Sequence, residues 1–307
     1  MKEKTSFKDR VVKDFQRNKW KYFIVIPVLV YLLLFAYKPM YGIIIAFKNF
    51  KPHIGIMDSK WVGLRYFKSL FSDMYFFRAL RNTLTISFLQ LLFSFPVPIV
   101  LALMLNEVKS QKFKKAVQTI TYMPHFISLV VVCGMLVSFC QSSGLFNDII
   151  VFWGGERKNL LIQEKLFYPI YILSGVWQQM GWDSIIYLAA LAGVDQEQYE
   201  AAKVDGAKRL QLIWHITLPS LVPVISMLLV LKMGRVLSVG HEKMLLLYQP
   251  ATYEVADIIS TYAYRRGLEM TDYSYSTAVS LFNSVVNIIF ITLANKVSKK
   301  LGQSGLF

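Results

Sequence analysis

Long apolar stretches separated by short polar segments dominate the hydropathy pattern of the chain. Residues 84–105, 123–140 and 276–295 contain no charged side chain. A helix of about 20 apolar residues is long enough to cross a hydrocarbon core of roughly 30 Å. The pattern predicts six spans, at about 22–45, 84–105, 122–140, 167–192, 218–240 and 276–295. We therefore expect an all-α membrane protein with six transmembrane helices.

Composition supports this fold class. Hydrophobic residues make up 55% of the 307 positions and charged residues only 17%, whereas soluble domains carry about 25% charged residues. The net charge of +15 is compatible with nucleic-acid binding, but eight of the basic residues precede the first apolar run. Basic residues in that position orient membrane proteins. We therefore expect no nucleic-acid partner.

The distribution of Lys and Arg predicts the topology. With a cytoplasmic N-terminus, the inside segments hold 18 basic residues and the longer outside segments hold 13. This bias follows the positive-inside rule and places both termini in the cytoplasm. The expected organisation is a basic tail (1–21), a transmembrane domain (22–295) and a second tail (296–307). No small-x-small cleavage site follows the first apolar run, so we expect this span to be retained.

Polar side chains interrupt three of the predicted spans. Charges are costly in hydrocarbon, so such residues usually face a bundle interior or a wet cavity, as in channels and transporters. Hydrogen bonding between helices is the alternative for each of them. The candidates for a solute pathway are Gln178, Gln179, Trp182 and Asp183 in the fourth span, Lys232 and Arg235 in the fifth, and Asn283 and Asn287 in the sixth.

A polar insert, residues 193–217, separates the fourth and fifth spans. Asp195 is a good N-cap, with Gln198 at capping-box spacing, so a helix should begin near Gln196. It should end at Asp205-Gly206, where glycine accepts the left-handed conformation. A second amphipathic helix should follow from about residue 207. Two short helices with a bend at Gly206 are therefore expected, the alternative being an amphipathic loop on the membrane surface.

The insert carries a resemblance. "EAAKVDGA" and "ITLP", which begin at Glu200 and Ile216, resemble the EAA motif of the permease subunits of binding-protein-dependent (type I) ABC importers. In that family the first helix is a coupling helix seated in a groove of an ATPase. The resemblance assigns this contact to Glu200, Ala201, Ala202, Asp205, Gly206 and Ala207.

Further segments, including "FPVPIVLALMLNE", "YMPHFIS" and "GWDSIIYLAALAG", resemble the polysaccharide or oligosaccharide permease branch. His241 and the Ile213-Trp214 pair depart from its pattern. The resemblance implies a bacterial cytoplasmic membrane location, a second homologous permease, two ATPase subunits, an extracellular solute-binding protein and an oligosaccharide substrate. A permease for another solute, and an unrelated channel or secondary transporter, are the alternatives. The identity, length and charge of the sugar are left open.

The sequence contains neither a nucleotide-binding motif nor a zinc-protease motif. It contains no G-x-x-x-x-G-K-[ST] loop for a nucleotide, and "HEK" at 241–243 is not the H-E-x-x-H zinc motif. We expect no cofactor in this chain, with ATP and Mg²⁺ bound by the partner ATPase. Cys133 and Cys140 lie seven residues apart in one apolar run, too far for a disulfide within a helix, and are expected to pack as small apolar residues.

Overall fold

The computed structural model describes residues 7–300 and 302, with side chains described from residue 14. This part of the chain is helical and holds no β-strand, although one antiparallel bridge joins Lys48 to Trp61. The α-helices are α1 (Phe7–Leu32), α2 (Lys38–Met40), α3 (Gly55–Asp58), α4 (Arg65–Leu70), α5 (Met74–Leu89), α6 (Pro96–Asn106), α7 (Gln111–Tyr122), α8 (Leu129–Cys140), α9 (Leu145–Phe152), α10 (Glu164–Ala192), α11 (Gln196–Val204), α12 (Arg209–Leu212), α13 (Leu218–Met233), α14 (His241–Leu247), α15 (Tyr253–Ala256), α16 (Ile259–Tyr264) and α17 (Tyr273–Lys300).

Short turns of other helix types join these elements. Four are π-helical, namely η1 (Leu33–Tyr37), η3 (Gln90–Ser94), η6 (Ile213–Thr217) and η8 (Arg265–Glu269), and four are 3₁₀, namely η2 (Tyr41–Phe47), η4 (Met123–Phe126), η5 (Leu160–Ile162) and η7 (Pro250–Thr252). The turns η1, η3 and η6 each come just before a proline, Pro39, Pro96 and Pro219. A proline ring clashes with the carbonyl four residues earlier in an α-helix, and the wider turn relieves that clash.

Five helical segments of the described chain are long and apolar enough to cross a membrane: 14–47, 74–106, 129–152, 209–233 and 273–300. They overlap five of the six predicted spans, although the second begins ten residues earlier and the third seven residues later than predicted. The remaining span falls on α10, whose 29 residues have the length of a span but include the Gln178, Gln179 and Asp183 side chains. Because α10 packs along α6, α7 and α13, its polar positions have helices around them. The count of six spans stays a prediction.

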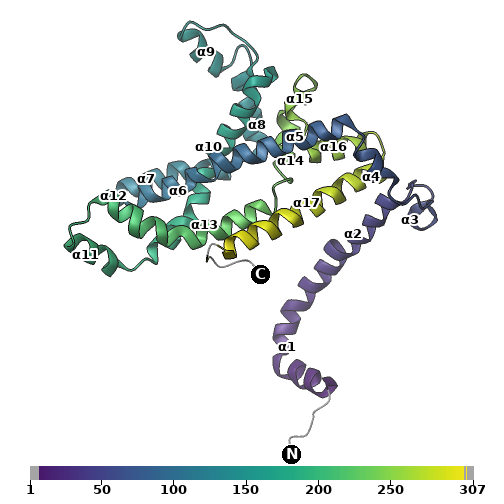
Figure 1. Cartoon of the computed structure of the whole chain (residues 1–307), viewed down its shortest axis with the longest axis horizontal. Coiled ribbons are helices and arrows are strands. Elements are labelled where there is room, and N and C mark those ends of the chain that lie inside the picture. Colours follow the sequence, from purple (N-terminus) through teal and green to yellow (C-terminus); the bar gives the residue numbers. More distant parts are fainter. Residues whose placement is uncertain (1–6, 301, 303–307) are drawn as a thin grey trace, which may run out of the picture.

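The first part of the first apolar segment, α1 to α2, stands apart from the rest of the molecule, whereas its last part, η2, packs against α17. Figure 1 shows α1 and α2 leading away from the bundle formed by α5, α6, α10, α13 and α17. In its most apolar window none of the side chains is buried; Phe35, for example, is 67% exposed. This helix is covered by nothing within the described part of its own chain.

Helix α5 begins ten residues before the predicted second span, because its charged first turns have partners. Asp73 caps it by accepting a hydrogen bond from the backbone N–H of Tyr75 at 2.9 Å. Arg78 and Arg81 form ion pairs with Glu254 of α15 at 3.2 and 2.9 Å. The hydrogen bond from Arg81 holds the pKa of the Glu254 carboxyl below its usual range. Residues 74–83 are too polar to be predicted as part of a span. They are helical here because their arginines pair with a residue more than 170 positions away in sequence.

A polar clamp fixes the segment between the last two spans. The fully buried Asp257 accepts hydrogen bonds from Arg265 at 2.5 Å and from Thr261 at 2.9 Å. The fully buried Asn82 of α5 donates to the carbonyl oxygens of Glu254 and Asp257. A buried carboxylate satisfied by a guanidinium and a hydroxyl holds its neighbours firmly in place. We call this set the α16 clamp: Asn82, Asp257, Thr261 and Arg265.

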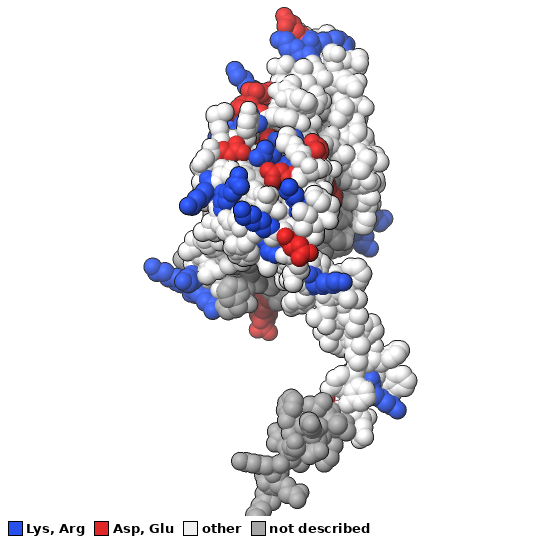
Figure 2. Space-filling model, turned by 90° about the vertical axis from the view of Figure 1, so that its right-hand side faces the viewer, with Lys and Arg blue, Asp and Glu red and all other residues white. Residues whose placement is uncertain are grey.

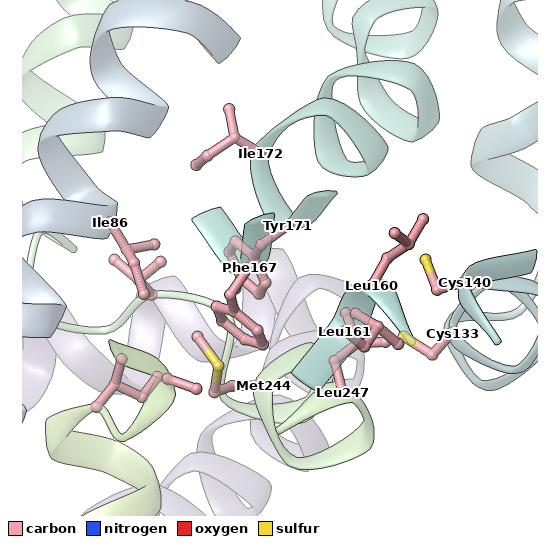
Figure 3. Close-up of a cluster of buried hydrophobic side chains, with 13 residues drawn as sticks. Ile86, Cys133, Cys140, Leu160, Leu161, Phe167, Tyr171, Ile172, Met244 and Leu247 are labelled. Atoms are coloured by element: carbon pink, nitrogen blue, oxygen red, sulfur yellow. The ribbon is translucent and has the colours of Figure 1, made fainter. Parts of the chain in front are cut away.

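The largest buried cluster lies where α8, α10 and α14 meet. Figure 3 shows Phe167 and Tyr171 of α10 at its centre, with Met244 beside them and Cys133 and Cys140 at one edge. Both cysteines are free and buried. Their predicted role as small apolar packing residues is confirmed.

Polar segments lie at both ends of the bundle. Figure 2 looks onto the end that carries α3 and α4, where Lys and Arg are interspersed with Asp and Glu. The insert helices α11 and α12 lie at the opposite end of the bundle (Figure 1). The polar insert and the α16 clamp are therefore at opposite ends of the spanning helices.

Candidate functional site

The first helix of the polar insert forms as its sequence predicts. Helix α11 begins at Gln196, and the Asp195 side chain accepts a hydrogen bond from the backbone N–H of Glu197 at 3.0 Å. Asp195 therefore caps the helix as predicted, but it accepts from the N–H of Glu197 and not from that of Gln198, the donor that a capping box would use. Asp195 satisfies one of the donors that every helix start leaves free.

Gly206 ends this helix in the left-handed conformation, with φ of +81°. The N–H of Ala207 donates to the carbonyl of Ala202 at 2.9 Å, and that of Gly206 to Lys203 at 3.0 Å. This pair of bonds is a Schellman motif, in which only glycine avoids a steric penalty at the left-handed position. The predicted bend at Gly206 is confirmed.

The second half of the insert differs from the expected short separate helix. Helix α12 begins at Arg209, two residues later than expected, and continues without a break through η6 into α13. The π turn accommodates Pro219, because the N–H of Leu218 reaches back to the carbonyl of Ile213. The insert therefore consists of the separate helix α11, a turn at Gly206, and the segment α12–η6, which extends α13 without a break.

Two contacts tie the insert to the spanning helices. The hydroxyl of Tyr199 in α11 lies 3.0 Å from that of Thr217, and the guanidinium of Arg209 forms a 2.6 Å ion pair with Glu107 next to α6. The positions of α11, α13 and α6 are thereby coupled.

Several side chains of the insert are exposed, and together they form what we call its exposed face. Val204 is 88% exposed and Trp214 63%, and no atom lies within 4 Å of the place where a Gly206 side chain would begin. A shallow pocket of about 280 Å³ adjoins this face and is lined by Ala202, Asp205, Gly206, Ala207, Gln211, Leu212, His215 and Ile216. Glu200 and Ala201 are exposed as well. Four of the six predicted contact residues thus line this pocket, and the other two are exposed on α11.

Three of the predicted pathway residues come together in a second place, which we call the charged cavity. It has a volume of about 310 Å³ between η3, α6, α10 and α13 and is lined by Ser94, Phe95, Pro98, Trp182, Asp183, Ile186, Tyr187, Leu228 and Lys232. The Lys232 ammonium lies 5.5 Å from the centre of the Phe95 ring. A carboxylate, an ammonium group and an indole ring in one cavity form a combination suited to a polar organic solute.

An aromatic stack supports one wall of the charged cavity. The ring of His125 lies parallel to that of Trp182, at 4.3 Å between centroids. Its Nδ1 is 2.9 Å from Oε1 of Gln179, which fixes the plane of the imidazole. From the sequence alone, His125 behind Pro124 is expected only to mark the entry to a span. Its role as the stacking partner of Trp182 has no signal in the sequence, because the two residues lie on different helices far apart in the chain.

The other predicted pathway residues lie elsewhere. The buried Gln178 donates to the carbonyl of Ile127 at 3.4 Å, and Asn287 accepts from the N–H of Leu237 and donates to Ser238, both at 3.0 Å. Both side chains hold connecting segments, Gln178 the one before α8 and Asn287 the turn after α13, and neither lines the charged cavity. Arg235 is exposed in the turn after α13, because that helix ends at Met233 and not near residue 240. Asn283 faces a separate pocket beside α16. The eight residues do not form one site.

Known proteins are similar to this chain over most of its length. The family described as "Binding-protein-dependent transport system inner membrane component" matches residues 69–303. The "Polygalacturonan/rhamnogalacturonan transport system permease protein YteP" of Bacillus subtilis (strain 168) is 48% identical over 95% of this chain and 91% of its own. "Protein LplB" of the same organism is 47% identical over 95% of this chain and 92% of its own.

Solved structures of bacterial ABC transporters are also similar to this chain. A chain of a bacterial ABC transporter involved in the import of the acidic polysaccharide alginate superposes with a TM-score of 0.89 at 47% identity, covering 96% of this chain and 100% of its own. A second structure shows the bacterial alginate ABC transporter in complex with a periplasmic protein bound to alginate pentasaccharide, with a TM-score of 0.89, 46% identity and coverage of 97% of this chain and 100% of that chain.

Proposed function

The chain belongs to the binding-protein-dependent transport system inner membrane components, and from this premise we propose that it is the permease subunit of an ATP-driven oligosaccharide importer. Its five apolar helices make it a multi-pass membrane protein. Membership of this family excludes the unrelated channel or secondary transporter. The single observation that carries the proposal is the accessible polar insert, joined rigidly to α13 and through Arg209 to α6.

We assign α11 as the helix that docks on a partner ATPase, which binds ATP and Mg²⁺. Glu200, Ala201 and Ala202 lie on this helix, and Asp205, Gly206 and Ala207 form its end. The small side chains permit close approach of a partner surface. Because α6 and α13 both contribute to the charged cavity, a movement of α11 would change the shape of that cavity. This is a physical route from ATP hydrolysis to the solute.

The proposed partners include a second permease of the same family. Helix α1 supports this, since its most apolar part is uncovered within the described chain. In the assembled transporter its surroundings are lipid and the partner permease. An extracellular solute-binding protein delivers the solute in this scheme. The similar alginate transporter, solved in complex with a periplasmic protein that carries alginate pentasaccharide, supports that part of the proposal.

We propose both termini in the bacterial cytoplasm, as the basic residues predict. The tails 1–21 and 296–307 lie partly outside the described residues, and Ser304 lies entirely outside them. In a Ser304→Cys variant, an impermeant thiol reagent added to intact cells should not label the protein. In the control, Glu156→Cys, it should label readily, because the Glu156 side chain is 82% exposed at the opposite side of the membrane in this topology. Labelling at residue 304 in sealed cells would reverse the orientation.

An acidic oligosaccharide is the substrate we favour. Relatives are named for polygalacturonan and alginate transport, and Lys232 gives the charged cavity a cation. Removing a charged hydrogen-bond donor costs about 1.5–3 kcal/mol. In vesicles that contain the complete transporter, Lys232→Gln should therefore lower uptake of trigalacturonate by roughly tenfold or more at low concentration.

Uptake of a neutral trisaccharide by the same Lys232→Gln vesicles is the internal control and should change little. Equal loss for both sugars would assign Lys232 to the stability of the bundle. Uptake of either sugar by wild-type vesicles must depend on ATP. If no oligosaccharide is taken up, a permease for another solute class becomes the better assignment.

A further inference from the structure

A further pocket, of about 460 Å³, lies between α5 with η3, the turn after α13, and α17. This volume is within the range of small-molecule sites. Phe88 and Leu91 line it from the middle part of the apolar segment 74–106, and Phe290 lines it from the middle part of 273–300. The pocket therefore lies at the depth of the middle of the spanning helices. We call it the arginine pocket, and its polar side chains are those of Ser87, Gln90, Lys232, Arg235 and Ser238.

Two cations line the arginine pocket, and neither forms an ion pair within the described residues. Arg235 is exposed, and its guanidinium makes no hydrogen bond to the described chain. Lys232 is partly exposed and lies against the Phe95 ring. The charged cavity also contains Asp183, whereas no Asp or Glu of the described chain lines the arginine pocket. Positive charges at mid-depth of a membrane protein are costly and are usually paired or face a wet cavity. These two charges are therefore left for an anion from outside the described chain to balance.

The turn that carries Arg235 is held from two sides of the bundle. Ser87 of α5 donates to the carbonyl of Val236, and Asn287 of α17 accepts from the N–H of Leu237 at 3.0 Å. The backbone on which the guanidinium stands is thus fixed by two different spans. A site whose framework is already in place spends little binding energy on ordering itself.

The chemistry of the lining favours a carboxylate beside hydroxyl groups. The N–H of Arg235 donates to the carbonyl of Lys232 at 3.1 Å, so the two cations stand on one turn of the chain. A guanidinium binds a carboxylate through two parallel hydrogen bonds, and its planar shape matches that group. Gln90 and Ser238 can both donate to and accept from sugar hydroxyls. A carboxylate attached to a ring of hydroxyl groups is the chemistry of a uronate.

We propose that the arginine pocket binds the carboxylate of one uronate unit, with Arg235 as its main contact. Lys232 lines both this pocket and the charged cavity, and it binds the carboxylate of the neighbouring unit. The proposal rests on the function proposed above and specifies its substrate. Two adjacent acidic units are then needed for full recognition, so a single uronate should be a poor substrate.

The first test compares two sugars in vesicles that contain the complete transporter. They are trigalacturonate and its methyl ester, which keeps the ring hydroxyls but has no charge. Arg235→Gln should raise KM for trigalacturonate roughly tenfold, because a charged hydrogen bond is lost, and should change KM for the ester little.

Lys68→Gln is the matched control for loss of a positive charge. Lys68 is exposed as well, but it lies in α4 and lines neither the arginine pocket nor the charged cavity. Both KM values should stay as in the wild type. Equal losses for the two sugars in Arg235→Gln would assign Arg235 to packing, and an unchanged KM for trigalacturonate in that variant, if well folded, would contradict the site.

A second readout does not depend on transport. Ser238 is exposed and lines the arginine pocket, while Cys133 and Cys140 are buried. In the assembled transporter, a Ser238→Cys variant should react several times faster with a negatively charged thiol reagent than with a positively charged one of similar size. Adding Arg235→Gln should remove most of this difference. Trigalacturonate should slow the reaction, and its methyl ester should not.

The outcomes of this readout separate the site from the proposed function. Protection by trigalacturonate without any uptake would support the pocket while contradicting the proposed function. Equal reactivity with and without trigalacturonate, in a transporter that takes it up, would contradict the pocket alone. Equal rates for the two reagents, or no reaction with either, would mean that the second permease neutralises or covers the pocket, and would overturn the proposal.

Discussion

Replacing Gly206 with valine should reduce ATP-driven uptake by roughly tenfold or more, while the chain still reaches the membrane. Gly206 has a φ of +81°, which costs a β-branched residue about 1–2 kcal/mol. Relief of this strain would open the Schellman motif that ends α11 and would tilt the helix out of the proposed contact with an ATPase. Substrate-stimulated ATP hydrolysis should fall together with uptake, and both are measured on reconstituted vesicles.

Gly154 offers a matched control for this substitution. It has the same φ of +81° and, like Gly206, no atom within 4 Å of an added side chain. It lies in the loop after α9, away from the insert (Figure 1). Gly154→Val therefore introduces the same backbone strain without touching α11. If both variants, or neither, lost coupling at normal expression, the docking role of α11 would be wrong.

Replacing Gly181 with alanine should destabilise the bundle by up to about 3 kcal/mol, the upper range for overpacking. An added Cβ at Gly181 would overlap the backbone carbonyl of Thr121 in α7. A backbone atom cannot rotate away as a side chain does, so α7 and α10 would have to separate. That movement would also disturb the His125–Trp182 stack. Thermal unfolding of the purified transporter measures the loss of stability.

Gly134→Ala is the corresponding control, because Gly134 lies inside α8 with no atom within 4 Å of an added Cβ. Alanine there should be neutral or stabilise by about 1 kcal/mol, as expected from helix propensity. Similar stability of the two variants would show that the contact between α7 and α10 is looser than the structure indicates.

Local signals in the sequence predict the features that local chemistry determines. Asp195 and Gly206 bracket α11 because capping depends on the residue itself and on its nearest neighbours. The apolar runs locate the spans for a similar reason, since burial in lipid depends on composition. The second insert helix forms after the bend, but it begins at Arg209 and runs on through a π turn before Pro219 into α13, a continuity that the local sequence does not predict.

Features that depend on contacts between residues far apart in the chain could not be predicted from sequence patterns. The start of α5 depends on Glu254 and Asp257, and the turn after α13 is held by Asn287 of α17. The polar residues chosen for a single pathway divide among the charged cavity, the pocket beside α16, the exposed turn after α13 and hydrogen bonds to connecting segments. Only three-dimensional packing decides which of them face a cavity and which face another helix.

The π turns before Pro39, Pro96 and Pro219 have a geometric consequence for the whole bundle. A π turn adds one residue to the helix ladder, and each residue of an α-helix rotates the chain by about 100°. Side chains beyond the turn therefore point in a different azimuth from those before it. In the second span, Asn82 of α5 faces the α15–α16 segment, whereas α6 faces α10. The second span, made of α5, η3 and α6, thus presents different faces to its neighbours at two depths of the bilayer. A single helical wheel therefore cannot describe which of its residues are buried.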